Sequence, residues 1–213
     1  MQRRDVRPGP DGPATGVVDI VAVDGKDRAD IDRLYGEMYR LLGHPGPPAG
    51  WIDEVVAQAL RGDRGLFIAK AACVALGFID FKLVRYHAAT GSTFCRIFDV
   101  FVKPEARQRG IGRRLWLQAL HTAKDRGADS VELNVLPANE GAQAFWQRQG
   151  FRGSTRSASD VTWRRTMPDG AGRAALQGKR RSSRRARRSW PSADPCLDLC
   201  VAHLDGRARR HCR

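Results

Sequence analysis

A strand that runs into a glycine loop and then into a helix, within residues 97–114, constrains this chain more than any other part of its sequence. β-branched and aromatic residues fill the strand until Pro104 ends it, and helical periodicity begins at Gly110-Ile111-Gly112. The glycines let main-chain N–H groups approach an anion at the start of the helix, where the helix dipole also favours negative charge. Four arginines add positive charge around the loop: Arg107, Arg109, Arg113 and Arg114. The stretch therefore predicts a phosphate-binding loop.

Other interpretations of the glycine loop fit less well. No Gly-Lys-Ser/Thr sequence closes it as in a P-loop, and residues 110–115 lack the third glycine of a dinucleotide fingerprint. A glycine pair by itself is also compatible with an ordinary turn before a surface helix. The residues that follow the helix favour the phosphate-binding interpretation.

A second strand and a short helix follow. Residues 131–135 alternate as a strand, and Asn139 precedes a helix over residues 140–149 that Gly150 ends. With the loop, this stretch resembles the GNAT superfamily of N-acetyltransferases. The matching segments are Val102-Lys103-Pro104-Glu105, residues 107–112, Asn139-Glu140-Gly141-Ala142, Phe145-Trp146 and Gly150-Phe151. The match covers the coenzyme half of such a domain, and residues 16–96 are compatible with the rest.

The resemblance implies a fold, a cofactor and a set of site residues. The implied fold is α/β, the GNAT-like acyl-CoA N-acyltransferase fold, with a central mixed β-sheet flanked by about four helices. Acetyl-CoA would be the acyl donor: the strand before the loop would offer main-chain groups to its pantetheine arm, and the loop would hold its pyrophosphate. The implied coenzyme-binding residues are Val100, Phe101, Val102, Arg107, Gln108, Arg109, Gly110, Ile111, Gly112, Arg113, Asn139 and Trp146.

Trp146 departs from the family pattern. Relatives commonly carry a tyrosine here, whose hydroxyl can protonate the departing thiolate. An indole N–H donates a hydrogen bond but is no acid near neutral pH. We expect Trp146 either to contact the thiolate or to pack as a core aromatic, and we count it among the catalytic candidates on the first interpretation.

The second catalytic candidate is Asp99, on the strand before the loop. An attacking amine must lose a proton, which calls for a carboxylate, a histidine or a water relay. The alternative is a structural carboxylate bonded to backbone or to Arg96. Glu132 and Asn134 share one face of the next predicted strand, but Asn134 stands where some relatives carry a glutamate.

The front of the chain supplies the remaining elements of a small α/β domain. We expect a strand over 17–23, helices over 31–41 and 51–60, and a hairpin over 66–69 and 74–84; a closing strand follows at 161–166. In relatives the two helices form one wall of the acceptor pocket. The side chains there that could meet a cationic amine are Tyr35, Glu37, Tyr39, Asp53 and Glu54, and His87 could guard the entrance.

Composition divides the chain into three parts. Residues 1–15 are expected to be a disordered lead, residues 16–167 the domain, and residues 168–213 an Arg-rich, disordered tail. The tail from residue 169 carries 12 Lys and Arg against 4 Asp, so it holds about +8 of the net charge of +14. Non-specific attraction to nucleic acid is a consequence of such charge. The same composition would arise if the stretch were translated out of frame.

The remaining expectations concern metals and location. Cys196, Cys200 and His203 match no common zinc-finger spacing, so no metal is expected. An odd number of cysteines and the absence of an export signal or a spanning segment favour a cytoplasmic protein. A homodimer is left open.

We therefore expect an N-acetyltransferase that moves an acetyl group from acetyl-CoA to a primary amine of a small molecule or a protein, by direct attack on the thioester. The alternatives are a non-catalytic acyl-CoA-binding module and a protein that associates with nucleic acid through its basic tail.

Overall fold

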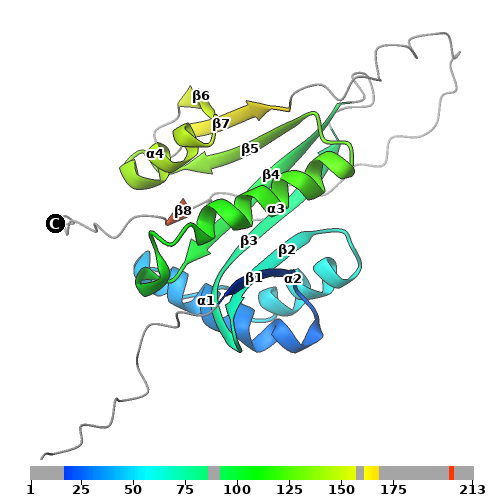
Figure 1. The fold of residues 1–213 in the computed structure, drawn as a ribbon, viewed down its shortest axis with the longest axis vertical. Helices are drawn as coiled ribbons and strands as arrows, with labels where there is room; N and C mark the ends of the chain where they lie inside the picture. Colours follow the sequence, from blue (N-terminus) through cyan, green and yellow to red (C-terminus); the bar gives the residue numbers. More distant parts are fainter. Residues whose placement is uncertain (1–16, 86–91, 157–160, 168–201, 204–213) are drawn as a thin grey trace, which may run out of the picture.

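The computed structural model describes residues 17–85, 92–156, 161–167 and 202–203 (Figure 1). The elements are β1 (Val18–Ala22), η1 (Gly25–Asp27), α1 (Arg28–Leu41), α2 (Trp51–Leu60), β2 (Gly65–Ala71), β3 (Val74–Arg85), β4 (Thr93–Val102), η2 (Pro104–Ala106), α3 (Ile111–Asp125), β5 (Ser130–Val135), α4 (Glu140–Arg148), β6 (Arg152–Arg156), β7 (Val161–Thr166) and β8 (Ala202–His203). No helix in these ranges is long and apolar enough to cross a bilayer.

A single mixed sheet organises the described chain. Its strand order is β1-β2-β3-β4-β5-β7-β6, and β8 pairs with β4 beside this path. All neighbours are antiparallel except β4 with β5 and β4 with β8, which are parallel. The helix α3 links the parallel pair β4 and β5 as a crossover and lies across one face of the sheet (Figure 1).

Two apolar clusters lie on opposite faces of the sheet. The larger joins α3 and α4 to alternate residues of the strands, with Leu115 and Trp116 of α3 fully buried. The smaller lies under α1 and α2, where Ile31, Leu34 and Met38 recur at helical spacing and are each at most 1% exposed. The sheet is thus covered by two helices on each face, as a mixed α/β layer requires.

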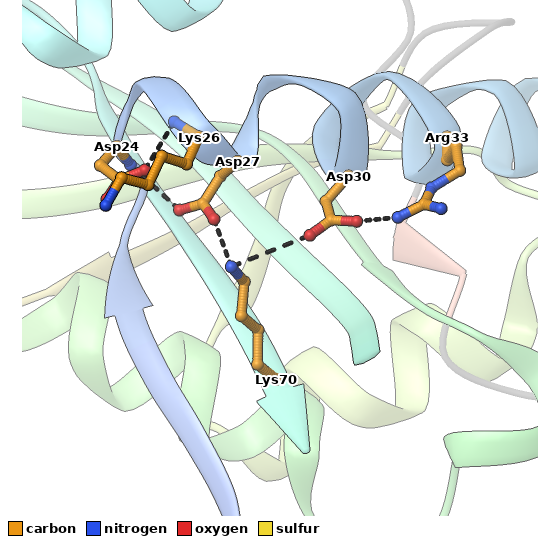
Figure 2. Close-up of polar contacts among 6 residues, drawn as sticks. All are labelled: Asp24, Lys26, Asp27, Asp30, Arg33 and Lys70. Atoms are coloured by element: carbon orange, nitrogen blue, oxygen red, sulfur yellow. Dashed lines mark hydrogen bonds and ion pairs between the residues drawn. The ribbon is translucent and has the colours of Figure 1, made fainter. Parts of the chain in front are cut away.

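A polar cluster ties the start of α1 to β2 (Figure 2). The side chain of Asp24 caps η1, and the Asp24 main-chain N–H in return donates to the Asp27 carboxylate, at 3.0 Å. Asp27 is only 5% exposed, and Lys70 of β2 supplies its counter-charge. Lys70 also lies 3.8 Å from Asp30 of α1. This network holds the first helix in register on the sheet.

The predicted fold is confirmed, with small changes of boundary. The hairpin strands β2 and β3 are longer than expected at their ends, and β5 begins one residue earlier. The strand β6 was not predicted, because its sequence, Arg152 to Arg156, lacks apolar alternation. The strand β8 was not predicted either, because it lies in the tail that was expected to be disordered. Residues 1–15, His87, Cys196 and Cys200 lie outside the described residues, as does most of the tail.

Candidate active site

The parallel strands β4 and β5 pair only at one end. The paired positions are Phe94 with Ser130, Cys95 with Val131 and Arg96 with Glu132. Beyond Arg96, β4 continues to Val102 while β5 pairs with it no further, so the two strands diverge. At residues 100–102, β5 therefore leaves the edge of β4 on its own side unpaired, whereas β3 pairs with the other edge. A divergence of this kind leaves main-chain donors and acceptors for an extended ligand.

The short strand β8 pairs with part of the edge of β4 that β5 leaves unpaired. Ala202 pairs with Val100 and His203 with Phe101, in parallel. Because β3 occupies the opposite edge of β4 at these residues, β8 takes the side that β5 has left. The side chains of Val100, Phe101 and Val102 are buried in the two apolar clusters. Only their main-chain groups could thus meet a ligand, and their contact with a pantetheine arm stays a prediction.

The loop after β4 has the backbone that anion binding calls for. Gln108 and Gly110 both have positive φ, +61° and +75°, and Gly110 is the N-cap of the 15-residue helix α3. Ile111 and Gly112 begin the helix and are buried, whereas Arg109 and Arg113 are exposed. The first turn of α3 contains no acidic residue. Its main-chain N–H groups thus open onto a basic surface.

Arg107 has a local structural contact. Its Nε donates to the carbonyl oxygen of Val102 at 3.0 Å, which ties the loop to the last residue of β4. The arginine that begins the motif therefore holds the loop on the strand. A contact of Arg107 with the coenzyme stays a prediction.

Gly110 offers a direct test of the loop. A Cβ at this position would meet nothing within 4 Å, so Gly110→Val costs backbone strain at positive φ without a clash inside the protein. We expect acetyl-CoA to bind at least tenfold more weakly, measured by calorimetry. Gly62→Val is the matched control. Gly62 has φ of +81°, a Cβ there would also meet nothing within 4 Å, and the residue is far from Gly110 along the chain. Equal coenzyme affinity in both variants would contradict the assignment of the loop.

The short helix α4 presents the two other predicted coenzyme residues. Asn139 is its N-cap, and its side-chain oxygen accepts a hydrogen bond from the Ala142 N–H at 3.0 Å. Trp146 is fully buried, edge-on to Trp116 and Phe151 at centroid distances of 5.6 and 5.0 Å. Trp146 thus packs in the core, as one of its two interpretations expected.

The indole N–H of Trp146 is buried and has no hydrogen-bond partner among the described residues. This donor is what the thiolate interpretation requires. Trp116 and Trp163 have the same property, so the unpartnered donor by itself does not distinguish Trp146. Its catalytic role stays a prediction.

Asp99 belongs to a buried cluster of polar side chains. It lies directly opposite Asp80 of β3, at a β-bulge, and the two carboxylates are 7% and 0% exposed. The Tyr35 hydroxyl donates to Asp80 Oδ2 at 2.8 Å and lies 3.5 Å from Asp99 Oδ2. Arg64 binds both oxygens of Asp80. The Oδ1 atom of Asp99 has no partner among the described residues.

The cluster changes the acid–base properties of Asp99. Burial raises the pKa of Asp99 well above its usual value, and the neighbouring charge of Asp80 raises it further. Arg64 and the Tyr35 hydroxyl oppose this shift. Burial, with both carboxylates, also raises the pKa of Tyr35. Arg64 forms an ion pair with Asp80, whereas Asp99 is in no ion pair among the described residues.

The partners of Asp99 were not predicted from the sequence. Backbone groups or Arg96 were the expected partners, whereas the structure places Tyr35 and Asp80 beside Asp99. A buried aspartate in the apolar run of residues 74–84 was the one available signal for Asp80. The Cζ atom of Arg64 lies 5.8 Å from the ring centroid of Trp51 and 4.8 Å from that of Phe98. No sequence pattern indicates these two contacts.

The acidic side chains of α1 and α2 are engaged elsewhere. Asp53 pairs with Arg28, Glu54 with Gln58 and Arg61, and Glu37 lies 3.8 Å from Lys103. Tyr35 points into the core. Among the described residues, no three His, Cys, Asp or Glu side chains gather as metal ligands.

Comparison with known proteins decides the family. The model of the acetyltransferase (GNAT) family matches residues 29–151, which is more than half of the chain. This chain belongs to the GNAT acetyltransferase family. The match includes β4, the glycine loop and α4, which contain the residues that the GNAT resemblance assigned to the coenzyme.

Among curated GNAT relatives, a mycothiol acetyltransferase of Rhodococcus jostii is 34% identical over 111 residues, which are 51% of this chain and 35% of that protein. The chain therefore spans about a third of the length of that relative. Among solved structures, the PaiA N-acetyltransferase of Thermoplasma acidophilum in complex with coenzyme A has a TM-score of 0.55 at 19% identity, over 71% of this chain and 99% of that one.

Naa50 of Arabidopsis thaliana, solved with the bisubstrate analogue CoA-Ac-MVNAL, is a second structural neighbour. Its TM-score is 0.56 at 18% identity, over 70% of this chain and 99% of that one. At this identity the likeness shows the fold alone. The mixed sheet and four helices of this GNAT protein are thus those of known acetyltransferase structures.

Proposed function

We propose that this GNAT protein transfers an acetyl group from acetyl-CoA to a primary amine. The observation that carries the proposal is the divergence of β4 from β5, which opens next to a positive-φ loop at the N-terminus of α3. An extended pantetheine arm suits the edge of β4, and a pyrophosphate suits the N–H groups and arginines of the loop. The names of the relatives support the same reaction class.

The reaction needs little covalent chemistry from the protein. The main chain of Val100 to Val102 would hold the thioester arm, so that the amine attacks a fixed carbonyl carbon, and placement of this kind lowers a barrier by several kcal/mol. The Asp99 carboxylate would accept the proton of the amine. Its unpartnered Oδ1 and its raised pKa suit a group that accepts a proton from the amine.

The departing thiolate needs either a proton or a hydrogen-bond donor. The N–H of Trp146 is a donor only, so the sulfur would leave as a stabilised thiolate and take its proton from solvent. Trp146→Tyr asks whether proton donation limits the reaction. An increased rate at neutral pH would mean that it does.

Calorimetric titration of the full chain with acetyl-CoA tests the proposal. Micromolar binding, followed by release of free thiol with an amine panel, is the expected result. Dephospho-CoA, which lacks the 3′-phosphate but keeps the pyrophosphate, is the control for the contribution of the 3′-phosphate. Binding without thiol release for any amine would favour the alternative function, a non-catalytic acyl-CoA-binding module, which the absence of a tyrosine at Trp146 supports.

Removal of residues 168–213 probes the role of β8. Ala202 and His203 pair with the β4 edge that the pantetheine arm would use, so the two compete. We expect the chain truncated after Met167 to bind acetyl-CoA about twofold to tenfold more tightly, since a net hydrogen bond contributes about 0.5–1.5 kcal/mol. Calorimetry measures the change. Weaker binding would show instead that the tail completes the coenzyme site.

We further propose that residues 16–167 form the catalytic domain and that the protein works in the cytoplasm. The basic tail, with its excess of arginine, supports non-specific contact with nucleic acid as a separate property. Salt-sensitive DNA binding that is lost on truncation after Met167, while thiol release persists, would separate the two.

A further inference from the structure

The hydroxyl of Tyr35 reaches two carboxylates of the sheet at once. It lies 2.8 Å from Asp80 Oδ2 and 3.5 Å from Asp99 Oδ2, and the two aspartates lie opposite each other on β3 and β4. A hydroxyl carries a single proton, so the bond to Asp80 is the stronger one and Asp99 shares the same donor more weakly. The hydroxyl therefore bridges the two carboxylates.

The ring of Tyr35 fixes the position of this bridge. Tyr35 is 0% exposed, and its ring lies edge-on to Trp51 of α2 and tilted against Phe78 of β3, at centroid distances of 4.9 and 4.3 Å. A ring that is packed from two elements has little room to move. The hydroxyl is thus held at one place relative to both strands.

The two bridged carboxylates differ in their other contacts. Arg64 binds both oxygens of Asp80. Asp99 is contacted by Tyr35 at Oδ2 only, and its buried Oδ1 has no hydrogen-bond partner among the described residues. The terminal torsion of an aspartate has a broad, two-fold preference, so that a contact at one oxygen decides which oxygen stays available. The bridge selects Oδ1 of Asp99.

Tyr35 itself keeps its proton. Burial raises the pKa of Tyr35 well above its usual value, and the charges of Asp80 and Asp99 raise it further, against the opposing effect of Arg64. Near neutral pH the hydroxyl is therefore a hydrogen-bond donor and neither gives up nor takes up a proton in turnover.

We propose that Tyr35 is a positioning residue for the proposed base: its hydroxyl holds Oδ2 of Asp99 beside Asp80, so that Oδ1 takes the proton of the amine. The inference rests on the proposed function, because it assigns the amine to Asp99. An N–H bond of the acceptor breaks, an O–H bond forms at Oδ1, and the electron pair stays on the nitrogen for attack on the thioester. Asp99 returns the proton to solvent after each turnover.

Two substitutions change the acid–base behaviour of Asp99 in opposite directions. Burial and then Asp80 raise the pKa of Asp99, whereas Arg64 and the Tyr35 hydrogen bond lower it. These are the groups that face Asp99 from α1, from β3 and from the turn before β2. Tyr35→Phe keeps the ring and removes the hydrogen bond, so the pKa of Asp99 should rise. Asp80→Asn keeps Tyr35 and removes a neighbouring negative charge, so it should fall.

A direct titration of Asp99 tests the bridge apart from catalysis. The NMR signal of the Asp99 carboxyl carbon, identified by its absence in Asp99→Asn, is followed against pH in the full chain. We expect its midpoint to rise by about half a pH unit or more in Tyr35→Phe and to fall in Asp80→Asn. Ile31→Val, one turn earlier in the buried stripe of α1, controls for a small loss of packing and should leave it unchanged. An unchanged midpoint in Tyr35→Phe would overturn the bridge.

Thiol release tests the positioning role. In Tyr35→Phe we expect kcat to fall about tenfold or more, and the rise of kcat/KM with pH to move to higher pH, while the KM for acetyl-CoA stays unchanged. Ile31→Val should retain the rate and the pH profile. Unmodified kcat and pH profile in Tyr35→Phe would overturn the positioning role. No thiol release by the unmodified protein with any amine would instead refute the proposed function, and the NMR titration would still report on the bridge.

Discussion

Asp99→Asn is expected to lower kcat by about 10²–10⁴-fold, because a positioned base contributes that much to a proton-transfer step. Asparagine has nearly the shape of aspartate but cannot accept the proton of the amine. The affinity for acetyl-CoA, measured by calorimetry, should stay within about twofold, since Asp99 faces α1 and not the coenzyme loop. A variant that turns over at the unmodified rate would return Asp99 to a structural role.

The same substitution has a second expected effect, on stability. The pKa of Asp99 is raised in the folded protein, so the folded state holds a proton that the unfolded chain has lost. Stability is therefore highest below the ordinary aspartate pKa and falls as pH rises towards the raised folded pKa. Asp80, Tyr35 and Arg64 are the groups that face Asp99, and they remain in the variant.

Urea unfolding between pH 4 and pH 8 measures this effect. We expect the unfolding free energy of Asp99→Asn to fall less steeply with pH than that of the unmodified protein. In the unmodified protein, kcat/KM should rise with pH through the raised pKa, because the base acts in its ionised form. Lower activity together with higher stability at pH 8 would identify a residue kept for function at the expense of stability.

Arg64→Leu is expected to cost about 3–5 kcal/mol of unfolding free energy. Asp80 is fully buried, and Arg64 binds both of its oxygens, so removing the cation leaves a buried carboxylate with only the Tyr35 hydroxyl. A loss of this size is a large part of the stability of a small domain. Urea unfolding at pH 7 measures it.

Arg61→Leu is the matched control for Arg64→Leu. Arg61 lies three residues earlier and pairs with Glu54 and Asp63, but its side chain is 55% exposed. Exposed pairs contribute about 0–1 kcal/mol, so little change is expected. The double variant Arg64→Leu, Asp80→Asn should recover much of the loss, because it removes both charges together. A loss of less than about 1 kcal/mol in Arg64→Leu would show that Asp80 finds another partner.

The two variants separate the roles within one cluster. Arg64 and Asp80 form the ion pair and Tyr35 donates to it, whereas Asp99 is the proposed base. Arg64→Leu is accordingly expected to act on stability first, whereas Asp99→Asn acts on turnover. Comparison of the two variants thus distinguishes the residue that stabilises the site from the residue proposed to act as the base.

The sequence by itself determined the coenzyme half of this protein. The strand before the loop, the positive-φ position at Gly110 and the Asn139 cap depend on residues close together in the chain, and local patterns report such features directly. The same holds for the buried stripe of α1 and for the helix α4. Among the strands, the weakly patterned β6 and the short β8 escaped prediction.

Tertiary structure alone decided which side chains meet across the sheet. Asp99 lies opposite Asp80 because of a bulge near Phe98, and a shift of register by one residue would turn its side chain to the other face. Register across a sheet depends on long-range pairing, which periodicity within one strand does not specify. The loop proposed to bind the coenzyme could therefore be predicted from the sequence, whereas the surroundings of Asp99 required the assembled fold.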